Sequence, residues 1–243
     1  MRSFMGAKLY RLWEPNPLTY PIGGDSPSPP PAGAAHAARQ GRRTCQKTRA
    51  IVNSKSMLGR YIGPLDNWAV VGQALDALGP GAIETLFDQG ITIEYLPATK
   101  TFSSVLPADA NPQLQREALE IDRTGHGDIQ GLYVSSLRRL FYRFATLRVL
   151  THELGHALDD ATGCFASAAL RDVPNPEPLT PYSTFNPKER LAEAVAAYLN
   201  ADRTAFGRLN RARLRATDRS AAAAVRLLFR RVNGSAFERA NHP

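Results

Sequence analysis

The sequence lacks several features that would place it among disulfide-rich secreted proteins or membrane proteins. It has only two cysteines in 243 residues, Cys45 and Cys164, which give neither a disulfide framework nor a metal-binding spacing and leave the redox compartment open. The apolar residues near the start are interrupted by Lys8 and Arg11, so no signal peptide is expected. No apolar stretch approaches transmembrane length, which argues against a membrane-spanning protein.

Charge is unevenly distributed, although the chain as a whole carries +8. Residues 1–60 contain ten Lys or Arg against two acidic residues, residues 61–202 contain ten against eighteen, and residues 203–243 contain ten against two. The first segment is also rich in Pro, Ala and Gly and has no apolar periodicity, so we expect residues 1–60 to be a disordered basic extension. Residues 61–243 are expected to form one folded domain.

Hydrophobic periodicity after residue 60 predicts an α+β domain. Helical spacing is present in residues 68–78, 81–87 and 113–121, and strand-like alternation in residues 91–96. Two closing helices with arginine-rich faces are expected in residues 202–232. These arginines are not interleaved with aromatic residues that could stack on bases, so no nucleic-acid partner is expected.

The segment before residue 150 allows two interpretations. The apolar runs 132–134 and 140–144 fit a hairpin, but the apolar residues are also spaced as in one long helix over residues 137–156. In the hairpin interpretation, Thr146 caps a helix that runs to about Asp160. The residues alone leave both possibilities open.

The most informative segment is Thr151–His156, which reads Thr-His-Glu-Leu-Gly-His. His152 and His156 are four residues apart and share one face of a helix, where both imidazoles can bind one Zn²⁺. Glu153 then lies beside the open coordination position. Zinc lowers the pKa of the water that it binds toward about 7, and a glutamate in this place can take the proton. The spacing therefore predicts metal-assisted hydrolysis.

Two histidines leave such a site short of one protein ligand. A metzincin needs Gly and His where this chain has Asp159 and Thr162, so that class is excluded. The other common solution is a carboxylate from a second helix, and residues 188–199 read as a helix with Glu189 and Glu193 one turn apart. One glutamate can bind the metal while the other accepts the N–H of a ligating histidine.

Three blocks of sequence resemble the catalytic domain of anthrax lethal factor and its relatives, including the Pro-Pro endopeptidases. The first is His152–Asp160. The second has Tyr182 seven residues before Glu189, followed by Leu191–Ala194, and the third is Gly131–Val134. The match covers about residues 90 to 240 and is specific in the order and spacing of the blocks.

The resemblance implies a role for each of the remaining candidates. Glu189 would be the third zinc ligand, Glu193 would support a ligating histidine, and Tyr182 would hydrogen-bond the carbonyl oxygen as it becomes an oxyanion. Relatives place a substrate-binding edge strand just before the zinc helix, which favours the hairpin interpretation. From the residues themselves, His126 is interpreted as a loop residue rather than a fourth ligand. The pair Asp159 and Asp160 is interpreted as a cluster at the end of a helix, and the alternative is that either of them orients a ligating histidine.

We therefore expect a zincin-like metalloprotease domain with a small sheet, in a zinc endopeptidase of the gluzincin type that acts on protein or peptide substrates. Its residues would be His152, His156 and Glu189 on Zn²⁺, Glu153 as base and Tyr182 at the oxyanion. The resemblance implies a secreted toxin or effector, or a cytoplasmic protein if it is not exported, and a monomer is expected. The alternative is a catalytically silent zinc domain whose basic ends bind nucleic acid or lipid.

Overall fold

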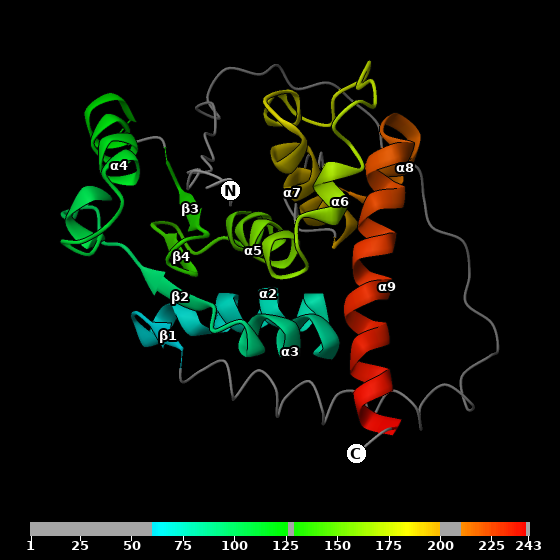
Figure 1. Cartoon of the computed structure of the whole chain (residues 1–243), viewed down its shortest axis with the longest axis horizontal. Coiled ribbons are helices and arrows are strands. Elements are labelled where there is room, and N and C mark those ends of the chain that lie inside the picture. The colour runs from blue at the N-terminus through cyan, green and yellow to red at the C-terminus, as the bar shows by residue number, and fades with distance from the viewer. Residues whose placement is uncertain (1–59, 126–128, 200–209, 242–243) are drawn as a thin grey trace, which may run out of the picture.

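The computed structural model describes residues 60–125, 129–199 and 210–241, and the expected extension over residues 1–60 lies almost wholly outside them. The described part is an α+β domain with a small mixed sheet on one side and a group of packed helices on the other (Figure 1). The coarse fold class predicted from the sequence is therefore confirmed.

The sheet has four short strands in the order β1-β2-β4-β3. β1 (Tyr61–Ile62) pairs in parallel with β2 (Thr92–Tyr95), which pairs in parallel with β4 (Arg139–Tyr142). β3 (Gly131–Val134) pairs antiparallel with β4 and, among the residues that the structure describes, forms the edge of the sheet. β3 and β4 form the predicted hairpin, and the competing interpretation as one long helix over residues 137–156 is wrong.

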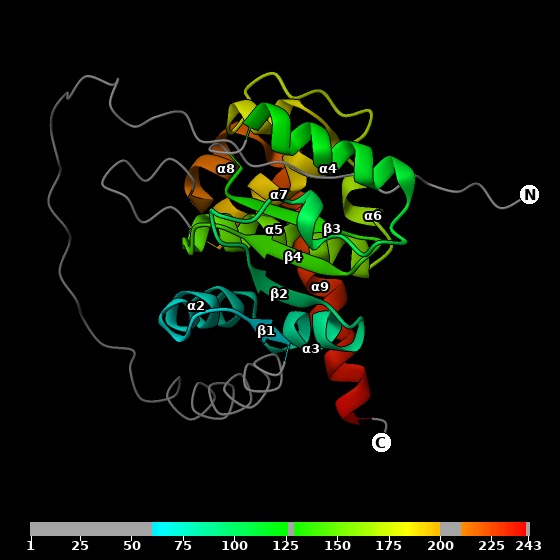
Figure 2. The same cartoon turned by 90° about the vertical axis from the view of Figure 1, so that its left-hand side faces the viewer.

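The two faces of the sheet carry two apolar cores, as expected from the alternation of side chains along a strand. On β4, Leu140 and Tyr142 face the larger core, which contains α2 (Trp68–Leu78) and α3 (Pro80–Asp88). Phe141 faces the smaller core. That core lies under α4 (Pro112–Gly125), which is five residues longer than predicted and lies beside the β3 end of the sheet (Figure 2).

In the described part of the chain, five further helices complete the larger core: α5 (Leu147–Ala161), α6 (Phe165–Ala168), α7 (Pro187–Tyr198), α8 (Arg211–Thr217) and α9 (Arg219–Asn241). The 3₁₀ turn η3 (Ser103–Val105) packs on the smaller core, and the other two 3₁₀ turns, η2 (Leu65–Asn67) and η4 (Pro181–Thr184), precede α2 and α7. The two closing helices are confirmed for the described residues, and α9 continues nine residues past the predicted end at Val232. Among the described residues, no helix combines the length and apolarity that crossing a bilayer requires.

α5 and α7 begin with the capping residues that the sequence indicates. The side chain of Thr146 accepts the N–H of Val149 at the start of α5, as predicted. Asn186 accepts the N–H groups of Lys188 and Glu189 at the start of α7, with Pro187 in the first turn. These caps fix where each helix starts and hence which side chains face the neighbouring helix.

The two helices approach closely at a glycine. A Cβ atom added to Gly155 on α5 would lie 3.2 Å from the Cα of Ala192 and 3.2 Å from the Cβ of Val195, both on α7. These distances are shorter than most Cβ contacts, so a side chain at position 155 would require α5 and α7 to shift apart by a few tenths of an ångström.

We predict that Gly155→Ala lowers the free energy of unfolding by about 1–3 kcal/mol, because the added methyl must push the two helices apart. The matched control is Gly72→Ala in the middle of α2, where an added Cβ meets nothing within 4 Å. That control should gain about 0.5–1 kcal/mol from the better helix propensity of alanine. Urea unfolding of the three proteins tests both values, and equal effects at the two sites would contradict the role given to Gly155.

Candidate metal centre

His152 and His156 on α5 meet Glu189 on α7 in the buried space between the two helices. The Nε2 atoms of the two histidines are 3.1 Å apart, and Oε2 of Glu189 lies 3.1 Å from Nε2 of His152 and 3.5 Å from Nε2 of His156. Tetrahedral ligands at about 2.0–2.1 Å from a zinc ion would be roughly 3.3–3.4 Å from one another. The three side chains therefore fit a small divalent ion, although the geometry does not determine which metal.

His152 is held from its other side by Glu193. Nδ1 of His152 lies 2.8 Å from Oε1 of Glu193, so Nδ1–H can donate to the carboxylate, and in the neutral form of His152 this leaves the lone pair of Nε2 facing the other two ligands. Arg148, one turn earlier on α5, lies 3.7 Å from the other oxygen of Glu193. Burial raises the pKa of Glu193, but its interactions with His152, Arg148 and Thr180 outweigh burial and lower it.

The titration of this cluster is shifted strongly in the metal-free protein. Burial lowers the pKa of His152, but its hydrogen bonds to Glu189 and Glu193 prevail and raise it to about 10. For Glu189, burial raises the pKa, but the charges and hydrogen bonds of His156 and His152 lower it to about 2. Burial lowers the pKa of His156. Without metal, the proton on His152, which is hydrogen-bonded to both carboxylates, thus provides the positive charge that a metal ion would otherwise supply.

Glu153 lies beside this cluster and is fully buried. No hydrogen bond of good geometry from the described residues reaches either carboxylate oxygen, although the backbone of Tyr133 in β3 is close enough to oppose the pKa shift. Burial raises the pKa of Glu153 to about 8, partly offset by His152. A buried carboxylate without a partner is costly to a fold, and such groups are often found at functional sites.

The edge strand passes directly over Glu153 at Gly131. A Cβ atom on Gly131 would lie 2.7 Å from Cγ of Glu153 and 2.8 Å from Cγ1 of Val149. Only glycine therefore lets β3 approach α5 so closely, and the edge strand and the candidate base border the same space. The sequence indicated the strand, but not this contact.

The structure places Tyr182 in η4, the 3₁₀ turn that precedes α7. Thr180 caps this turn through a reciprocal pair of hydrogen bonds with Ser183. The side chain of Tyr182 is buried, and its ring meets the ring of Phe185 edge-on with centroids 5.1 Å apart. Thr180 also interacts with Glu193, so the turn that carries Tyr182 is tied to the residue that holds His152.

The other acidic and basic candidates have separate places. Asp159 accepts hydrogen bonds from the N–H and hydroxyl of Ser167, and Asp160 accepts one from the hydroxyl of Tyr133, so both stabilise the end of α5. His126 lies outside the described residues.

Sequence reasoning missed Arg148, whose position one turn before His152 could have indicated a neighbour of the site. It also missed Arg190, the residue after the candidate ligand Glu189. The guanidinium of Arg190 forms two hydrogen bonds with Asp218, at 2.7 and 2.8 Å, and donates to the carbonyls of Val173 and Pro174. Arg190 thereby fixes the start of α7 against the proline-rich loop and α9.

Comparison of the chain with protein-family models, with curated proteins and with solved structures finds no match. The resemblance to the lethal factor family therefore rests on the sequence blocks, and any functional argument must rest on the geometry of this site.

We predict that the metal-free protein loses stability as the pH rises from about 6.5 to about 9. The folded-state pKa of His152 is about 10 against 6.5, so its contribution is complete below 6.5 and is lost as the pH rises toward 10. Glu153, at about 8 against 4.5, loses its contribution over a lower range in the same direction. Thermal melts in chelator should show the melting temperature falling over this range.

Added zinc should stabilise the protein more at pH 8 than at pH 6.5, because binding requires deprotonated ligands. Arg139→Met serves as a control outside the cluster. It removes an ion pair with Glu94 in the sheet, which has the same 3.7 Å length as the ion pair of Arg148 with Glu193, and it should leave the pH dependence of stability unchanged. A metal-free melting temperature that stays constant or rises between pH 6.5 and 9 would show that the cluster titrates differently.

Proposed function

We propose that this protein is a zinc-dependent endopeptidase of the gluzincin type, with a zincin-like catalytic domain. The observation that carries the proposal is the environment of Glu153. Its carboxylate is fully buried, accepts no good hydrogen bond from the described residues, and lies beside three side chains able to hold a metal ion. A purely structural metal site has no use for such a group, whereas hydrolysis needs a base next to the metal.

His152, His156 and Glu189 would hold the zinc ion, with Glu193 keeping the tautomer of His152. When bound, the metal would supply a Lewis acid and would lower the pKa of the attacking water. Glu153 would take a proton from that water as its oxygen adds to the carbonyl carbon, and would pass the proton to the leaving amine as the C–N bond breaks. The hydroxyl of Tyr182 donates to the carbonyl oxygen as negative charge develops on it.

The substrate is proposed to be an extended peptide. Among the described residues β3 pairs only with β4, so the backbone N–H and C=O groups on its other edge are the ones that a further strand would pair with, although all four residues of β3 are buried. Because Gly131 lies against Glu153, a peptide paired with this edge would pass the base. This arrangement supports cleavage within a chain, since neither end of the peptide is required for binding.

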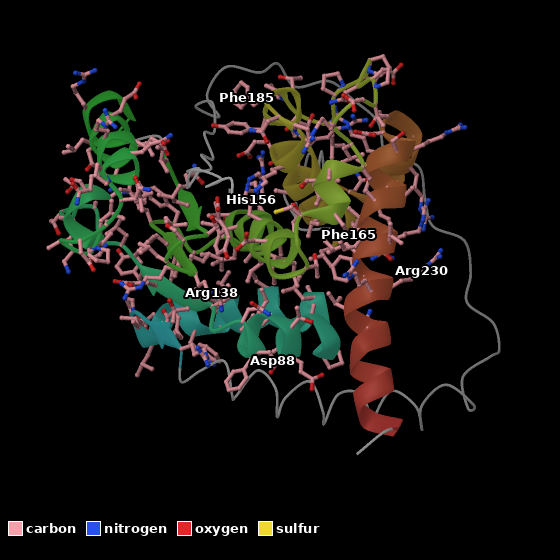
Figure 3. All side chains as sticks on the ribbon, in the orientation of Figure 1. Asp88, Arg138, His156, Phe165, Phe185 and Arg230 are labelled. Atoms are coloured by element: carbon pink, nitrogen blue, oxygen red, sulfur yellow. The ribbon has the colours of Figure 1, made fainter. Side chains whose placement is uncertain are left out.

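The alternative, a silent zinc domain that binds an anionic partner through its basic ends, is less well supported. Arg219, Arg226 and Arg230 are exposed on α9, and Figure 3 shows Arg230 on the outside of this helix. A solvated helix face is enough to account for these arginines. Glu153, which accepts no hydrogen bond of good geometry from the described residues, would have no role in such a protein. We therefore favour hydrolysis, in a secreted toxin or effector as the resemblance implies.

The first test separates metal binding from catalysis. We expect His152→Ala, His156→Ala and Glu189→Ala to lower the zinc content from about one ion per chain, because each removes a ligand. Glu153→Gln should keep zinc and lose peptide hydrolysis, since it removes only the base. Metal analysis and cleavage of a proteome-derived peptide library provide the measurements.

Glu177→Gln, at an exposed position in the proline-rich loop, serves as the control and should keep both zinc and activity. Full zinc retention in all three ligand variants would refute the site. A Glu153→Gln variant as active as the parent would refute the role of Glu153 as base.

The second test concerns Tyr182. We expect Tyr182→Phe to fold and bind zinc normally but to lose about 10²-fold or more in kcat with little change in KM, because one donor to the oxyanion is removed. The control is Tyr198→Phe at the other end of α7, where the ring stacks on Phe229. Unchanged kcat in Tyr182→Phe would mean that Tyr182 only packs in its turn.

A further inference from the structure

Phe185 is an exposed aromatic residue just before the start of α7. It directly precedes Asn186, the capping residue of α7, and 66% of its surface is exposed. An apolar residue in this position usually packs against the fourth residue of the helix. Here that residue is Arg190, whose buried guanidinium is committed to Asp218 and two carbonyl groups. Phe185 therefore has no apolar partner on its own helix.

The ring of Phe185 instead contacts Tyr182, the candidate donor to the oxyanion. It meets the ring of Tyr182 edge-on, at 5.1 Å between centroids and an interplanar angle of 72°. It also lies four residues before Glu189, whose N–H is held by the side chain of Asn186. Figure 3 shows Phe185 and His156 on the same side of α7, the side toward β3.

The contact between the two rings places the exposed ring of Phe185 beside the candidate oxyanion donor. If the hydroxyl of Tyr182 binds the carbonyl oxygen of the bond to be cut, a substrate side chain next to that bond can meet the ring of Phe185. Such a side chain would cover the exposed ring.

We propose that Phe185 determines specificity by contacting an apolar side chain, aromatic or branched aliphatic, adjacent to the scissile bond. This inference rests on the proposed endopeptidase function. An apolar contact at a binding site discriminates between large and small side chains by roughly 10- to 200-fold. We therefore expect kcat/KM to be at least about 10-fold higher for substrates with Phe or Leu beside the cut than for those with Ala.

The experiment has one arm that does not need hydrolysis. Two pools of labelled short peptides share the same degenerate flanking residues and differ only in a central Phe or Ala. Their binding to zinc-loaded Glu153→Gln protein is followed by fluorescence anisotropy, alone and combined with Phe185→Ala or Phe185→Leu. The Phe pool should bind at least about 10-fold more tightly, Phe185→Ala should abolish the preference, and Phe185→Leu should keep part of it.

The matched control is Phe87→Ala on α3, which removes a partly exposed Phe from the other side of α5 and should keep the preference. Equal binding of the two pools, or a preference that survives Phe185→Ala, overturns the inference. The second arm measures kcat/KM of the otherwise unsubstituted protein and of Phe185→Ala on the same pools. Phe185-dependent binding without any hydrolysis by the unsubstituted protein would refute the proposed function and support Phe185 as an apolar peptide contact.

Discussion

The close contact between α5 and α7 is the constraint on which the rest of the site depends. His152 and His156 are on one helix and Glu189 is on the other, so their donor atoms meet only if the two backbones approach nearer than ordinary side chains allow. Gly155 permits that approach. Around it, buried apolar residues of the larger core pack against both helices, and the capping residues of each helix set its start. The metal centre is therefore a consequence of helix packing.

Packing alone does not explain why this interior holds so much charge. Glu153, Glu189 and Glu193 are all nearly or fully buried, and carboxylates taken out of water destabilise a fold unless cations or hydrogen bonds compensate. Glu189 and Glu193 are each hydrogen-bonded to His152, whereas Glu153 accepts no comparable hydrogen bond from the described residues. Local preferences that conflict with the fold in this way are expected at functional positions. The most costly residue in the interior is thus also the most informative about its chemistry.

Several features of the site could be predicted from the sequence because they depend on local spacing. The separation of His152 and His156 determines that they share a helix face, and the cap at Thr146 follows from the type of residue at the start of an apolar period. The hairpin was also predicted. Spacing could not distinguish Glu189 from Glu193, since both lie one turn apart on α7. The structure distinguishes them, because one faces both Nε2 atoms and the other faces Nδ1 of His152.

The features that could not be predicted all join residues distant in the sequence. The parallel pairing of β2 with β4, the ion pair of Arg190 with Asp218 and the contact of Gly131 with Glu153 leave no periodic pattern in either partner. Gly131 illustrates the reason. In the sequence Gly131 is only a small residue that precedes an apolar run. The path of β3 over α5 is what shows that a side chain at this position would displace Glu153. A local pattern can name the residues that do chemistry, whereas the distances between them come from the packing of the whole domain.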